Sequence, residues 1–198
     1  MHQLITLNNG KQIPVLGLGV WNIPKTECEQ AVLMALEAGY RHIDTARVYA
    51  NEKEVGSAIS KSGIPREEIF VTTKLWNDDQ GYDGANSAID KSLERLRMDY
   101  VDLYLIHWPD LSWSRAKINE PNKRADTWKA MEEICRSGKA KSIGVSNYTV
   151  PHLEEMKTYA QISPAVNQVE LHPFLFRKEL MEYCHQNSIA VENYCPLT

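Results

Sequence analysis

The sequence predicts an α/β protein, a (β/α)8 barrel of the TIM type preceded by an N-terminal β-hairpin. Short, apolar, β-branched runs alternate with amphipathic stretches along the 198 residues. Such alternation predicts right-handed crossovers and a mainly parallel sheet. Seven repeats of the unit are too many for a small open sheet, and a complete barrel needs roughly 250 residues. We therefore expect one domain, residues 1–198, that lacks strand eight and the C-terminal helices.

Each predicted strand is a short apolar, β-branched run. Residues 4–7 and 13–15 flank an Asn8-Asn9-Gly10 turn, which predicts the hairpin. The barrel strands are predicted at residues 15–20, 42–45, 69–74, 101–107, 142–145, 165–170 and 190–194.

Helical signals fill the segments between these strands. Thr26 and Glu29 have the spacing of a capping box, which predicts that Thr26 caps a helix. Apolar residues recur on one helical face in three further segments: Ala85, Ala88, Ile89, Ser92, Leu93 and Leu96; Trp128, Met131 and Cys135; Leu180 and Cys184. Gly39, Gly63 and Gly138 stand where helices should end. The polar residues 110–124 are predicted to form a long loop after the fourth strand.

Composition excludes several classes of partner. The formal net charge is -4 and no basic run occurs, so nucleic acid and anionic membranes are not expected to bind. No secretory signal or bilayer-length apolar stretch is present. The four cysteines, Cys28, Cys135, Cys184 and Cys195, form no CxxC pair, so neither a metal site nor a disulfide framework is expected. These features predict a cytoplasmic protein.

Four polar residues are predicted to converge at one end of the barrel, where catalytic groups of such folds lie. Asp44, Lys74 and His107 end the second, third and fourth strands, and Tyr49 follows Asp44 by five residues. Taken singly, each is better explained by a surface ion pair or by packing. Their placement at three adjacent strand ends favours a shared site.

The chemistry of this quartet suits reduction of a carbonyl group. A tyrosine hydroxyl has a pKa of about 10, and a buried lysine ammonium would lower it. Asp44 can act as the counter-ion of Lys74, and a neutral His107 can orient a substrate oxygen. Together they would donate a proton to an oxygen that gains negative charge while a cofactor supplies hydride.

Polar and aromatic residues also end the later strands. Ser146, Asn147 and Gln168 have the amide and hydroxyl groups that could hold a carboxamide, and Tyr194 could stack on a flat heterocycle. Capping and core packing remain the alternative explanation for each one. No GxGxxG motif follows a strand, so a Rossmann site is not indicated.

Five motifs in this order closely resemble the aldo-keto reductase family. They are GYRHIDTA at residues 39–46 with Tyr49 and Asn51-Glu52, VTTKLW at 71–76, VDLYLIHWP at 101–109, IGVSNY at 143–148 and NQVELHP at 167–173. The resemblance covers essentially the whole chain. Within the family it is greatest to the prostaglandin F synthase and 2,5-diketogluconate reductase branch.

This resemblance implies NADPH-dependent reduction of aldehydes, ketones, quinones or prostaglandin-type carbonyls. It implies that Tyr49 donates the proton, Lys74 lowers its pKa, Asp44 pairs with Lys74 and His107 orients the carbonyl. The implied cofactor contacts are Gly19, Val20, Trp21, Asp44, Ser146, Asn147, Gln168, Tyr194, Cys195 and Leu197. The implied substrate-pocket walls are Trp21, Trp76 and Trp108. Complete relatives are often monomers, which implies a monomer here if the protein is full-length.

Two departures from the family pattern limit these expectations. Cys195 replaces the usual serine, and a thiol is a weaker hydrogen-bond donor toward a pyrophosphate. The family segment that binds the adenosine 2′-phosphate is absent, so NADPH and NADH cannot be distinguished. We expect the sequence to be part of a longer protein, although completion by a partner or by strand exchange stays open. A non-catalytic cofactor-binding or structural relative is the alternative function, and the physiological substrate is not predicted.

Overall fold

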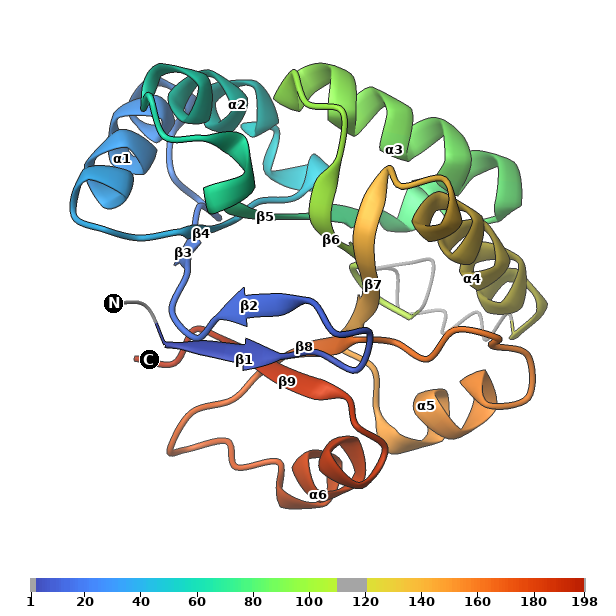
Figure 1. Cartoon of the computed structure of the whole chain (residues 1–198). Coiled ribbons are helices and arrows are strands. Elements are labelled where there is room, and N and C mark those ends of the chain that lie inside the picture. Colours follow the sequence, from blue (N-terminus) through green and yellow to red (C-terminus); the bar gives the residue numbers. More distant parts are fainter. Residues whose placement is uncertain (1–2, 110–120, 198) are drawn as a thin grey trace.

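The computed structural model describes residues 3–109 and 121–197, which form a parallel sheet surrounded by helices (Figure 1). Within this part of the chain, seven strands pair in the order β3-β4-β5-β6-β7-β8-β9, so each strand lies beside its neighbour in sequence. Their bounds are β3 Leu18–Gly19, β4 His42–Asp44, β5 Phe70–Leu75, β6 Val101–Ile106, β7 Ala140–Ser146, β8 Val166–Glu170 and β9 Ala190–Tyr194. The parallel sheet curves into a nearly closed barrel and confirms the predicted fold class.

Helices cover the outer face of the sheet (Figure 1). They are α1 Lys25–Glu37, α2 Glu52–Lys61, α3 Tyr82–Leu96, α4 Pro121–Arg136, α5 Val150–Met156 and α6 Lys178–Gln186. Short 3₁₀ turns occur at Arg47–Tyr49, Arg66–Glu68 and Asn77–Asp79. The apolar face predicted for α3 is buried at all six positions. None of the described helices is both long enough and apolar enough to cross a membrane.

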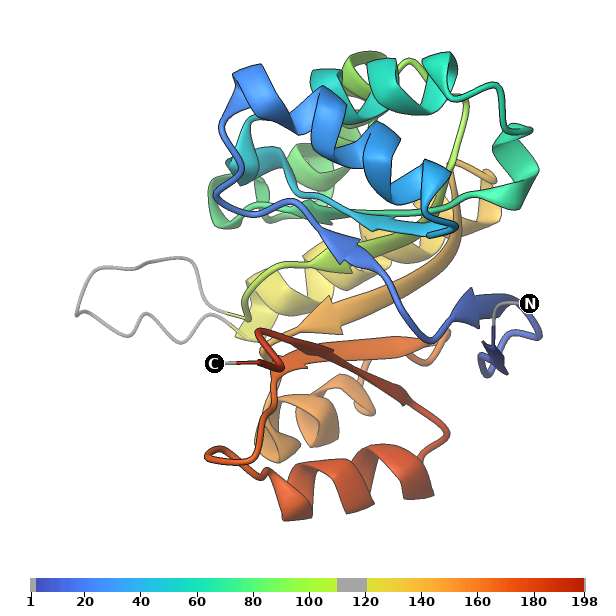
Figure 2. The same cartoon turned by 90° about the vertical axis from the view of Figure 1, so that its left-hand side faces the viewer.

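The N-terminal hairpin covers the end of the barrel where the strands begin (Figure 2). Strands β1 (Leu4–Thr6) and β2 (Gln12–Pro14) pair around the predicted Asn-Gly turn. Leu7 and Ile13 pack inward against Phe70, Leu103 and Leu105. The hairpin thus covers one end of the barrel and leaves uncovered the opposite end, where the strands finish.

Three sequence predictions are wrong in detail. Only Leu18–Gly19 of the strand predicted at residues 15–20 pairs in the sheet, while Val15 and Leu16 are 52% and 63% exposed. Thr26 does not cap a helix, because it lies inside α1, which begins at Lys25 directly after Pro24. Residues 121–124 of the predicted long loop belong to α4, and residues 110–120 of it lie outside the described part of the chain.

Candidate functional site

The four residues of the predicted quartet lie together at the carboxyl end of the barrel. Asp44 ends β4, Lys74 is the penultimate residue of β5, and His107 directly follows β6. Tyr49 ends the 3₁₀ turn Arg47–Tyr49, which brings its side chain back over the strand ends. In parallel strands these ends share one edge, and this explains how residues 63 positions apart in sequence, from Asp44 to His107, become neighbours.

Lys74 and Asp44 form a buried ion pair at the centre of the site. The Lys74 side chain is only 1% exposed, and its ammonium donates to Asp44 Oδ1 and, over 3.1 Å, to the carbonyl oxygen of Thr45. Gln168 Nε2 donates to Asp44 Oδ2 over 2.6 Å. Burial lowers the pKa of Lys74, but the opposing effects of Asp44 and Tyr49 outweigh it and the pKa is raised. Lys74 is therefore a permanent cation at neutral pH.

The hydroxyl of Tyr49 lies beside this cation. Lys74 Nζ donates to Tyr49 Oη over 3.4 Å, and the same nitrogen lies 5.1 Å from the centre of the tyrosine ring. Burial raises the pKa of Tyr49, whereas the charge of Lys74 lowers it. The effect of burial is larger, so the pKa of Tyr49 is raised overall. The predicted lowering by Lys74 is therefore present but is outweighed by burial, which depends on the finished fold.

His107 packs edge-on against two aromatic rings. Its ring centre lies 5.7 Å from that of Tyr49 and 5.3 Å from that of Trp76. Burial and the nearby Lys74 charge lower the pKa of His107 to about 3, so the imidazole is neutral at neutral pH. Its buried Nδ1 makes no hydrogen bond to any described residue. A neutral ring held by aromatic contacts can exchange a hydrogen bond with a polar ligand atom.

The polar residues predicted to hold a carboxamide are connected to the quartet. Ser146 Oγ donates to the carbonyl oxygen of Gln168 over 2.8 Å, and Asn147 Nδ2 donates to that of His107 over 3.0 Å. Tyr194 Oη donates to Asn147 Oδ1 over 2.8 Å, which leaves that oxygen a second lone pair. Asn147 has a left-handed backbone, φ 64°, that directs its side chain toward these partners. Amide and hydroxyl groups of this kind can exchange hydrogen bonds with a carboxamide.

Of the remaining predicted contacts, some lie next to the quartet and others are largely exposed. Gly19 pairs with Asp44 across the sheet, and the backbone N–H of the buried Val20 donates to the Asp44 carbonyl oxygen. Trp76 contacts His107, and the half-buried Trp108 accepts a hydrogen bond from Gln80 Nε2 through its carbonyl. By contrast, the described residues leave Trp21 65% and Leu197 98% exposed. Cys195 is half-buried with φ 50°.

Two polar residues inside the barrel were not predicted from the sequence. His42 lies two residues before Asp44 on β4, and Glu192 lies two residues before Tyr194 on β9. Side chains two apart on a strand share a face, so this alternation was the signal that could have found them. In the described part of the chain, His42, Asp44 and Glu192 place side-chain ligand atoms within 4.8 Å of one another.

Comparisons with known proteins identify the family to which the chain is similar. The model of the Aldo/keto reductase family matches residues 15–198. An aldo-keto reductase of Mycolicibacterium smegmatis is 51% identical over all of this chain and 69% of its own length. Glyoxal reductase of Bacillus subtilis is 48% identical over 98% of this chain and 67% of its own length. The chain thus spans about two thirds of the length of these relatives.

Solved structures show the same backbone. An aldo/keto reductase from Brucella melitensis superposes with a TM-score of 0.93 at 46% identity, over 100% of this chain and 74% of that one. An aldo-keto reductase of Bombyx mori in complex with NADP superposes with a TM-score of 0.91 at 39% identity, over 98% of this chain and 66% of that one.

Proposed function

Because the chain belongs to the aldo/keto reductase family, we propose that it reduces aldehydes or ketones to alcohols with NADPH, using Tyr49 as the proton donor. The observation that carries this proposal is the contact of 3.4 Å between Tyr49 Oη and Lys74 Nζ, with Asp44 holding the ammonium in place. A cation in this position stabilises the phenolate that remains once the tyrosine has given up its proton.

The other residues of the site have complementary roles in the proposal. His107, neutral and held edge-on to Tyr49, donates a hydrogen bond that orients the carbonyl oxygen toward the tyrosine hydroxyl. Asn147 and Gln168 hold the carboxamide of the cofactor, and Tyr194 packs against its ring. NADPH, when bound, supplies the hydride. Trp76 and Trp108 line the substrate side of the site.

The names of relatives support a small carbonyl substrate and NADPH, rather than NADH, as the cofactor. Glyoxal reductase of B. subtilis and 9,11-endoperoxide prostaglandin H2 reductase of Trypanosoma cruzi are 48% and 47% identical to this chain. The Saccharomyces cerevisiae relative, 43% identical, is named glycerol 2-dehydrogenase (NADP(+)). We therefore extend the proposal to short aldehydes as first substrates to test.

The test is NADPH consumption with glyoxal and with an aromatic aldehyde, in the wild type and in Tyr49→Phe. We expect the variant to lose about 10²- to 10⁴-fold in kcat, because it keeps the ring packing but has no proton to give. Tyr40→Phe is the matched control, since Tyr40 precedes β4 at the other end of the barrel. Equal turnover by Tyr49→Phe and the wild type would refute the role of Tyr49. A folded wild type that binds NADPH without turnover would support the non-catalytic alternative.

A further inference from the structure

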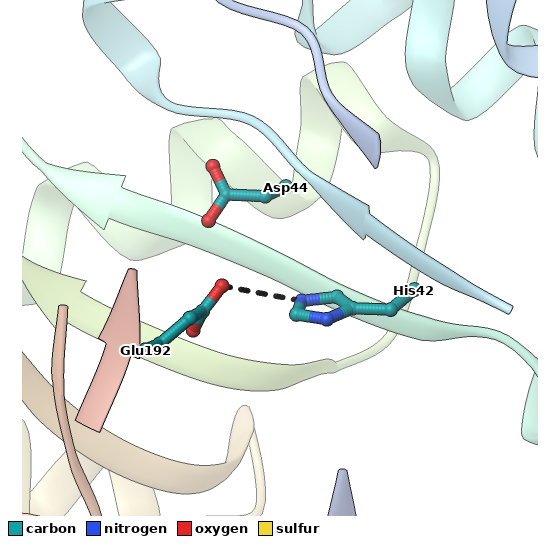
Figure 3. Close-up of side chains that lie close together, drawn as sticks. All are labelled: His42, Asp44 and Glu192. Carbon is teal, nitrogen blue, oxygen red and sulfur yellow. Dashed lines mark ion pairs between the residues drawn. The ribbon is translucent and has the colours of Figure 1, made fainter. Parts of the chain in front are cut away.

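A second carboxyl group lies inside the barrel next to the Asp44–Lys74 pair. Figure 3 shows that the side chains of His42, Asp44 and Glu192 point toward one another from β4 and β9. Glu192 Oε1 lies 4.0 Å from His42 Nε2, and Glu192 pairs with Gln168 across the sheet. Glu192 Oε2 is buried without a hydrogen-bond partner among the described residues. The roles proposed for Asp44, Tyr49, Lys74 and His107 do not require the Glu192 carboxyl group.

The charges around Glu192 do not balance if it is ionised. The groups that face it are His42 and Asp44 from β4, Lys74 from β5 and Gln168 from β8. Burial lowers the pKa of His42 to about 4, so His42 adds no positive charge at neutral pH. Lys74 is then the cation that acts on two carboxyl groups, and Asp44 already holds it. Two carboxyls that share one cation do not both ionise readily.

The protonation state of Glu192 follows from this imbalance. Burial, together with the charge of Asp44, raises the pKa of Glu192 to about 8, although the charge of Lys74 and a hydrogen bond from the Gln168 side chain act in the opposite sense. Glu192 is therefore neutral at neutral pH and becomes an anion only in mildly alkaline solution.

A divalent cation explains this cluster less well than a proton does. Asp44 already receives the Lys74 ammonium on Oδ1 and the Gln168 amide on Oδ2, and His42 Nε2 already lies 2.9 Å from Thr72 Oγ1. A metal ion would have to displace these partners and would lie beside the positive charge of Lys74.

We propose that Glu192 is a positioning residue whose proton governs how strongly Lys74 supports the acidity of Tyr49. The inference rests on the proposed function and adds a regulating group to it. With Glu192 neutral, the charges of Asp44 and Lys74 cancel, and the ammonium stabilises a Tyr49 phenolate. With Glu192 ionised, the cluster has a net negative charge. That charge draws the ammonium toward the two carboxylates and disfavours the phenolate, so reduction slows.

The first experiment measures the proton on Glu192 without using activity. The free energy of unfolding is followed against pH in the wild type and in Glu192→Gln, with Glu179→Gln on the exposed face of α6 as control. A carboxyl whose folded pKa is raised stabilises the fold at low pH, and this stability is lost as pH rises from the unfolded value to about 8. We expect the wild type to lose stability relative to Glu192→Gln over that window, and Glu179→Gln to follow the wild type. Parallel curves for all three proteins would overturn the proposal.

The second experiment measures the effect on Tyr49. The measured quantity is kcat for Glu192→Gln divided by kcat for the wild type, as a function of pH. We expect this ratio to rise about tenfold from about two pH units below the pKa of Glu192 to about two pH units above it. A ratio that stays constant, although Glu192 titrates in the stability curves, would overturn the proposal. Full activity in Tyr49→Phe would instead refute the proposed function, so the two failures can be told apart. If Glu192→Gln does not fold, carboxyl NMR of the wild type replaces the stability curves, and absence of a glutamate that titrates near pH 8 overturns the proposal.

Discussion

Lys74 is the residue on which both the charge balance and the proposed proton transfer depend. In Lys74→Met, Tyr49 keeps the burial that raises its pKa and loses the charge that lowers it, so its pKa must rise further. We expect kcat for reduction to fall about 10²-fold or more. We also expect the alkaline limb of the pH–rate profile to move to higher pH. The measurement is kcat against pH with saturating NADPH and aldehyde. Lys53→Met, an exposed lysine of α2, is the control that should leave the profile unchanged.

The same substitution leaves Asp44 buried without its cation, which alone costs about 3–5 kcal/mol. Loss of activity could therefore reflect loss of fold. The double variant Lys74→Met/Asp44→Asn removes both charges and should recover stability but not the rate. Recovery of the rate along with stability would show that Lys74 supports the fold and not the acidity of Tyr49.

For single residues, the sequence predicted where the side chains lie better than it predicted their pKa shifts. Strand-end placement was enough to bring Asp44, Lys74, His107 and Tyr49 together, because parallel strands finish at a common edge. The net shift of the Tyr49 pKa could not be predicted, since it depends on how much of the ring the finished fold buries. Alternation along β9 places Glu192 on the same face as Tyr194, but its partners His42 and Asp44 come from β4, so the cluster appears only once the sheet has curved.

Among the secondary-structure elements, α2 and α3 make the closest backbone approach that a single substitution can test. A Cβ at Gly56 in α2 would overlap the backbone carbonyl of Leu96 at the end of α3. Alanine favours a helix over glycine by about 1 kcal/mol, but overpacking typically costs about 1–3 kcal/mol and a backbone atom cannot rotate away.

We therefore expect Gly56→Ala to lower the free energy of unfolding by about 1–3 kcal/mol, measured by urea denaturation. Ser60→Ala, on the exposed side of the same helix, should change it by less than about 0.5 kcal/mol. Greater stability of Gly56→Ala would mean that helix propensity outweighs the close contact, contrary to this account.

Element boundaries were harder to predict than element types. The apolar periodicity of α3 determined its buried face completely, because burial repeats with the turn of the helix. The start of α1 was misplaced, since the capping box at Thr26 competes with Pro24, whose fixed φ suits the residue just before a helix. The strand predicted at residues 15–20 is short because Val15 and Leu16 lie in the exposed connection from the hairpin to the barrel.

For the whole molecule, the alternation of strands and helices was sufficient to predict the barrel. The variation of its stability with pH depends instead on ionisable groups that the barrel buries. His42 is 2% exposed, and burial lowers its pKa to about 4 from an unfolded value of about 6.5. A base with a lowered folded pKa contributes stability above its unfolded pKa, and this contribution is lost as pH falls toward the folded value. Glu192 acts in the opposite direction, because its contribution is lost as pH rises toward about 8.

His42→Gln separates these effects, since glutamine can still hydrogen-bond Thr72 but takes up no proton. Between about pH 7 and about pH 4, we expect the wild type to lose roughly 3 kcal/mol of unfolding free energy that the variant does not lose. Urea denaturation at a series of pH values gives this difference. His185→Gln, in an exposed position of α6, should follow the wild type. Curves for His42→Gln that run parallel to the wild type would show that the pKa of His42 is not lowered in the folded protein, contrary to this prediction.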